Sequence, residues 1–134
     1  MVLLQLISSV AFPSLTYNLE PLALNKRELM SLEHSWSRIF MKIFSTFDTN
    51  VVKQCQWYGG FMPLSYLLSK RKMGFLLKLA TSENMLLNSL FDLNGLTEMQ
   101  EVANKFNIEL CLFKDNYVAE INKHFCDEIS HIRT

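Results

Sequence analysis

Side chains able to do acid–base, nucleophilic or metal chemistry are scattered through this sequence. The three histidines, His34, His124 and His131, lie far apart along the chain and within helical patterns, where a surface or packed histidine is the ordinary interpretation. His124 and His131 with Asp127 or Glu128 would form only a loose metal site, because their spacing is not that of a zinc-binding helix. We therefore expect no metal ligands, no cofactor, no small-molecule ligand and no catalytic residue.

Other site types are also missing. The pair Gly59-Gly60 is not followed by Lys and Ser or Thr, so it is not a phosphate-binding loop. No pair of aspartates lies on a predicted hairpin of the kind that polymerases use to hold two magnesium ions. Cys55, Cys111 and Cys126 are an odd number without metal-ligand spacing, which indicates reduced thiols in an intracellular protein, nuclear or cytoplasmic.

Charge is unevenly distributed along the 134 residues, although the net charge is zero. Residues 1–80 contain nine Lys or Arg against four Asp or Glu, and residues 81–134 contain four against nine. The first part could therefore meet a polyanion, whereas the acidic second part would not. An apolar content of 49% is enough for the core of one domain, and only four glycines and three prolines favour long helices.

The clearest predicted element is a helix from Asn25 to Phe44. Asn25 and Glu28 form a capping box, in which each side chain accepts a hydrogen bond from the backbone N–H of the other residue. Apolar residues then recur at three- and four-residue intervals, which predicts one buried side: Leu29, Leu32, Trp36, Ile39, Phe40 and Ile43.

The opposite side of this helix carries small hydroxyls and two cations but no acid: Ser31, Ser35, Arg38, Lys42 and Ser45. One interpretation is a solvated face. The other is a surface that contacts phosphates, because small residues permit close approach and the cations supply charge.

The remaining pattern is also helical. We expect further helices at 2–19, 49–58, 63–80, 82–93, 97–107 and 116–132, whereas 108–113 is either a short strand or a continuation of a helix. Pro13 should kink the first helix, which we expect to be buried because it lacks a cationic start and is too short for a membrane anchor. The sequence thus predicts an all-α fold, an irregular bundle of about six or seven helices, with no membrane segment.

Several of these boundaries are predicted from capping residues and helix-breaking residues. Asp48 or Thr49 can cap the third helix, and Ser82 can cap the fifth. The pair Asn94-Gly95 should stop the fifth helix, and Thr97 with Gln100 reads as a capping box that opens the sixth.

A second basic stripe lies on the predicted helix at 63–80. Lys70, Arg71 and Lys78 fall on one flank together with Gly74. This glycine either marks the close approach of another backbone or is tolerated in a helix stabilised by tertiary packing.

An ordered series of segments resembles the C-terminal part of the reverse transcriptases encoded by non-LTR (LINE-like) retrotransposons of animals. The first segments are Leu-Thr-Tyr-Asn-Leu-Glu at 15–20, Leu-Asn-Lys at 24–26 and the helix at 32–44. The later ones are the glycine-containing break at 55–64, the Lys/Arg-rich helix at 70–79 and Ser82-Glu-Asn with the following leucines and Phe91. The resemblance covers about residues 3–91.

The resemblance implies a thumb region that closes over a primer–template duplex. The residues that match the expected phosphate contacts are Arg38, Lys42, Lys70, Arg71 and Lys78. Fingers, palm and the catalytic Asp-Asp motif would lie before Met1, so polymerase activity is not carried over to this chain, and a missing palm domain is an expected partner. We thus expect a thumb-like region at 1–91 and an acidic helical extension at 92–134, with RNA or an RNA–DNA duplex bound by the basic N-terminal half.

Two alternatives stay open. One is a small helical protein–protein interaction module that uses an exposed surface around Trp57, Tyr58, Phe61 and Met62. The other is a transposon remnant without a selected function.

Overall fold

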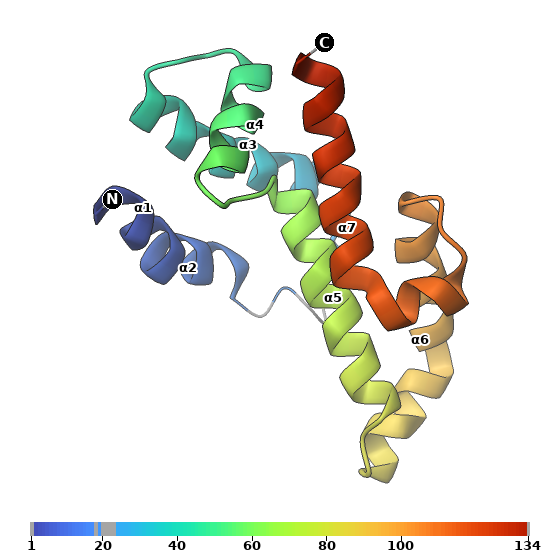
Figure 1. Cartoon of the computed structure of the whole chain (residues 1–134). Helices are drawn as coiled ribbons and strands as arrows, with labels where there is room; N and C mark the ends of the chain where they lie inside the picture. Colours follow the sequence, from blue (N-terminus) through green and yellow to red (C-terminus); the bar gives the residue numbers. More distant parts are fainter. Residues whose placement is uncertain (1, 18, 20–23, 134) are drawn as a thin grey trace. The chain divides into compact units, whose positions relative to one another are not determined.

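A computed structural model describes residues 2–17, 19 and 24–133, apart from the side chains of residues 112–114. The elements, in chain order, are α1 (Val2–Leu6), the π-helix η1 (Ile7–Ala11), α2 (Phe12–Thr16), α3 (Lys26–Phe44), α4 (Thr49–Tyr58), α5 (Leu64–Ala80), α6 (Met85–Lys105) and α7 (Leu110–Arg133), as seen in Figure 1. No strand occurs within these residues, and the segment at 110–113 is helical. The prediction of an all-α fold is confirmed.

The chain packs as two compact units. Unit 1 comprises Met1–Leu68 with His131–Thr134, and unit 2 comprises Ser69–Ser130. Each unit is described separately below. The division expected from charge and resemblance, 1–91 and 92–134, stays a prediction.

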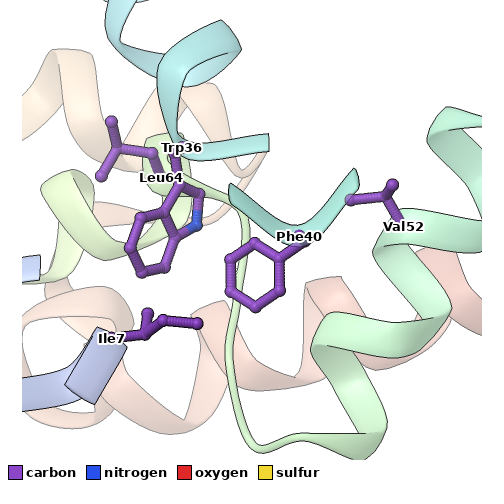
Figure 2. Close-up of a cluster of buried hydrophobic side chains, with 5 residues drawn as sticks. All are labelled: Ile7, Trp36, Phe40, Val52 and Leu64. Atoms are coloured by element: carbon purple, nitrogen blue, oxygen red, sulfur yellow. The ribbon is translucent and has the colours of Figure 1, made fainter. Parts of the chain in front are cut away.

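Unit 1 is built around two aromatic side chains of α3. Trp36 and Phe40 are fully buried, and their rings meet edge to face with centroids 5.1 Å apart. Figure 2 shows Ile7, Val52 and Leu64 around them, each from a different helical element. Edge-to-face pairs add to the stabilisation from the buried area, so α3 organises this core.

Both ends of α3 follow local rules. The Asn25 side chain accepts a hydrogen bond from the Glu28 N–H, and the Glu28 carboxylate accepts one from the Asn25 N–H, each at 2.9 Å. At the other end Ser45 takes a left-handed conformation, with φ of 52°. The predicted capping box is confirmed, and it sets where the polar face of α3 begins.

The residues between α4 and α5 are held by side chains of α3. The Trp36 Nε1–H donates to the Met62 carbonyl at 2.9 Å. The Glu33 carboxylate accepts from the backbone N–H groups of Leu64 and Ser65 at 3.1 and 2.7 Å. Because the first N–H groups of a helix lack intrahelical acceptors, Glu33 supplies the start of α5 with both hydrogen bonds and a favourable charge.

Unit 2 contains most of α5 and α7 together with α6. Its core is made by Met73 and Leu76 of α5, Met99, Val102, Ala103 and Phe106 from α6 and its C-terminus, and Ile121, Phe125 and Ile129 of α7. α5 and α7 lie side by side in Figure 1. A Cβ built on Gly74 of α5 would lie 3.1 Å from the hydroxyl oxygen of Tyr117 in α7. Of the two interpretations of Gly74, the close approach of another backbone is not observed, because the atoms nearest to it belong to the Tyr117 side chain of α7.

The predicted break at Asn94-Gly95 is wrong. α6 runs without interruption from Met85 to Lys105, so neither the stop nor the second capping box exists. Gly95 is buried inside the helix, with the ring of Phe91 lying where a Cβ would be. The glycine thus serves packing and not chain reversal. The predicted cap Ser82 is also wrong, because the N-cap is Asn84.

The first helix differs in detail from the prediction. A π-helical stretch at Ile7–Ala11 precedes Pro13, which is tolerated in the first turn of α2. Ile7 is buried, but Val2, Leu3, Leu6 and Val10 are exposed, so the expectation of a buried helix holds for only part of it. Among the described residues, no helix is both long and apolar enough to cross a bilayer.

Candidate nucleic-acid interface

The polar side of α3 is open to solvent. Its five predicted members are all exposed: Ser31, Ser35, Arg38, Lys42 and Ser45. The Ser35 hydroxyl donates to the Ser31 carbonyl at 3.0 Å, which keeps its side chain close to the helix backbone. The hydroxyl residues therefore leave room beside the two cations.

Arg38 and Lys42 border a shallow hollow with Ser35 and Ile39, about 240 Å³ in volume. Residues four apart on a helix have Cβ atoms about 5–6 Å apart, so both cations can reach one phosphate or two successive ones. Neither has an ion pair or hydrogen bond with the side chains that the structure describes. We call this pair the α3 cation pair.

Two residues of this face were missed in the sequence. Arg27 and His34 are exposed and lie eleven and four residues before Arg38, which places them on the same side of α3. The helical spacing that identified the serines would have found them. The acid of α3 nearest to this face is Glu28, and its carboxylate accepts the hydrogen bond from the backbone N–H of Asn25.

The cations predicted on α5 belong to unit 2 and differ in their surroundings. Lys70 is half-buried, and its ammonium donates a hydrogen bond to Asn122 of α7. Desolvation by burial lowers the pKa of Lys70 from its ordinary value of 10.5. Arg71 and Lys78 are exposed. The assignment of all three residues to a nucleic acid stays a prediction, and Lys70 is the one partly taken up by internal packing.

The surface suggested for protein binding is not assembled as expected. Trp57 and Tyr58 are exposed, but Phe61 packs against Phe40 with ring centroids 5.3 Å apart, and Met62 is buried. The glycine-containing break turns these two side chains into the core of unit 1, with Gly60 at φ of 77°. The expectation that Phe61 and Met62 form an exposed patch is wrong.

Groups able to do chemistry remain dispersed. The His124 ring lies edge-on against Phe106, with centroids 5.4 Å apart, while His124 itself is exposed. Cys55 is half-buried, whereas Cys111 and Cys126 are exposed, and all three are free thiols. In the part of the chain that the structure describes, no three His, Cys, Asp or Glu residues are grouped to hold a metal ion.

We compared the chain with known protein families, curated proteins and solved structures. No protein-family model, no curated protein and no solved structure matches this chain. The interpretation of the site therefore depends on its own geometry and on the resemblance described above.

Proposed function

We propose that this chain is the thumb-like C-terminal piece of a non-LTR retrotransposon reverse transcriptase, without catalytic activity of its own, and that it binds RNA or an RNA–DNA duplex weakly through the α3 cation pair. The duplex backbone would lie along the exposed side of α3, where Arg38 and Lys42 contact phosphates. Sequence-specific contacts are not part of the proposal, because phosphate contacts carry no base information.

The observation that supports this proposal most is the α3 cation pair itself. Arg38 and Lys42 are exposed, stand beside small hydroxyl residues and border a hollow. Arg27 lies on the same side near the start of α3, so this side carries positive charge toward both ends of the helix. A solvated face remains the competing interpretation, and it predicts no binding.

Fluorescence anisotropy with a labelled RNA–DNA hybrid tests the proposal. Two phosphate contacts should make the logarithm of the association constant fall with the logarithm of salt concentration with a slope of about 1.4 to 1.8. Lys42→Glu should weaken binding and lower this slope by about 0.7 to 0.9. A matched control is Lys123→Glu, which makes the same charge change on an exposed lysine of α7.

Absence of binding at low salt would remove the nucleic-acid claim and leave the transposon remnant. Equal loss of affinity in the Lys42 and Lys123 variants would show that only net charge matters, and the assignment to α3 would then fail. A single-stranded RNA of the same length, measured in parallel, distinguishes duplex preference from general polyanion binding.

A further inference from the structure

His34 occupies a gap in the row of cations along α3. It lies seven residues after Arg27 and four before Arg38, and all three side chains are exposed. With Lys42 the four positions fall within an arc of about 80°, at about 100° per residue. Arg27 and Arg38 are separated by about 16 Å of helix, and a charge on His34 would divide this gap into steps of about 10 and 6 Å.

The imidazole of His34 is not engaged inside the protein. It makes no hydrogen bond, ion pair or ring contact with any residue in the part of the chain that the structure describes. The two acids of α3 accept hydrogen bonds from backbone N–H groups, Glu28 at the cap of α3 and Glu33 at the start of α5. Both carboxylates are therefore directed at backbone groups and not at His34.

The elements packed against α3 bring few charged groups. α1, η1 and α2 contain no titratable side chain. Outside α3, the described residues of unit 1 that carry charge between about pH 5 and 8 are Asp48, Lys53, His131 and Arg133. Asp48 is the one acid among these four, and its carboxylate accepts a hydrogen bond from the Asn50 N–H at the cap of α4. A counter-charge for a protonated His34 would therefore come from outside the described part of unit 1.

We propose that His34 is a third phosphate-contacting residue on the exposed side of α3 and that it acts when protonated, so that acidification strengthens the binding of a nucleic-acid backbone. The inference rests on the function proposed for α3 and adds its regulation by pH. Histidine is the side chain whose charge ordinarily changes between pH 5 and 8. The protonated ring supplies a positive charge and two N–H donors, whereas the neutral ring has one donor and no charge.

Binding and protonation should favour each other. Arg38 lies one turn from His34, and like charges at this spacing repel weakly in the free protein. A phosphate that contacts both side chains attracts both charges and offsets this repulsion. A ligand that binds the protonated form more tightly also favours protonation, so the complex should take up protons as it forms.

Fluorescence anisotropy with the labelled RNA–DNA hybrid, at about pH 8 and about pH 5.5, tests the proposal. On acidification the third contact should raise the salt slope by about 0.7 to 0.9, and the affinity at about 0.1 M salt by about fivefold. His34→Gln should lose most of this rise. The matched control His131→Gln removes an exposed histidine of unit 1 outside α3 and should retain it. His34→Lys should bind at pH 8 about as tightly as the wild type does at pH 5.5.

The outcomes separate this inference from the function on which it rests. A rise on acidification that is as large in His34→Gln as in the wild type would overturn the role of His34 and leave the proposed function standing. Absence of binding at both pH values would overturn both.

Proton uptake on binding is an independent readout. Isothermal titration calorimetry near about pH 6.5, in two buffers of different ionisation enthalpy, measures the protons that the complex takes up. The wild type should take up more protons than His34→Gln does. Equal uptake by the two proteins would contradict the proposal.

Discussion

Glu33 offers the sharpest test of how unit 1 is held together. Its carboxylate accepts hydrogen bonds from the backbone N–H groups of Leu64 and Ser65 at 3.1 and 2.7 Å. Hydrogen bonds to charged groups contribute about 1.5 to 3 kcal/mol each. The side chain is half-buried, so water can replace it in part after Glu33→Ala. We therefore expect the free energy of unfolding to fall by about 2 kcal/mol, nearer the value for one bond than for two.

Tryptophan fluorescence during urea denaturation measures this change in unit 1 alone. Both tryptophans of the chain, Trp36 and Trp57, lie in that unit. With a slope near 1 kcal/mol per molar urea, the midpoint should fall by about 2 M. Glu33→Gln keeps one acceptor oxygen but loses the charge, so its effect should be about half as large.

Glu109→Ala is the matched control, because Glu109 is an exposed acid of unit 2. Glu109→Ala should leave the urea midpoint of the fluorescence transition unchanged. If Glu33→Ala shifts the midpoint no more than Glu109→Ala does, the argument that α3 anchors the start of α5 is refuted.

Three further substitutions probe single positions. The Nε2 of buried Gln56 lacks a hydrogen-bond partner among the described atoms, so Gln56→Leu should raise unit 1 stability by about 1 kcal/mol in the fluorescence assay, more than Gln54→Leu does. Because the pKa of Lys70 is lowered in the folded chain, the unfolded chain binds more protons between that pKa and 10.5. In thermal melts followed by circular dichroism, the melting temperature of the wild type relative to Lys70→Met should therefore rise as pH rises through this window. A difference in melting temperature that does not depend on pH would contradict the argument. Gly74→Ala should stabilise unit 2 by up to about 1 kcal/mol more in a Tyr117→Phe background than in wild type, because the Tyr117 hydroxyl near the new Cβ is then absent. Equal effects in both backgrounds would show that the Tyr117 side chain moves aside freely.

Local signals in the sequence predicted what lies within a few residues of each signal. Asn25 with Glu28 identified the start of α3, and the cap of α4 is Asp48, one of its two predicted candidates, because a cap joins residues only two or three positions apart. Helical spacing likewise identified Trp36 and Phe40 as buried and Arg38 as exposed.

The same local reasoning failed where packing overrode it. Gly95 resembled a helix stop, yet α6 continues through it and buries it together with Met99 and Val102. The hydrogen bond of the Lys70 ammonium to Asn122, 52 positions away, could likewise not be inferred from spacing, and the assignment of Lys70 to a nucleic acid stays a prediction.

For this protein, the sequence by itself determined the helical class, the start of α3 and the two sides of that helix, because these depend on local capping, backbone propensity and a period of 3.6 residues. Tertiary structure alone decided which faces stay open: it buried Met62, packed Phe61 against Phe40, engaged Lys70 and left leucines of α6 exposed. The physical reason is that burial depends on what packs from elsewhere in the chain, and the amphipathic pattern of a single helix does not specify that neighbour.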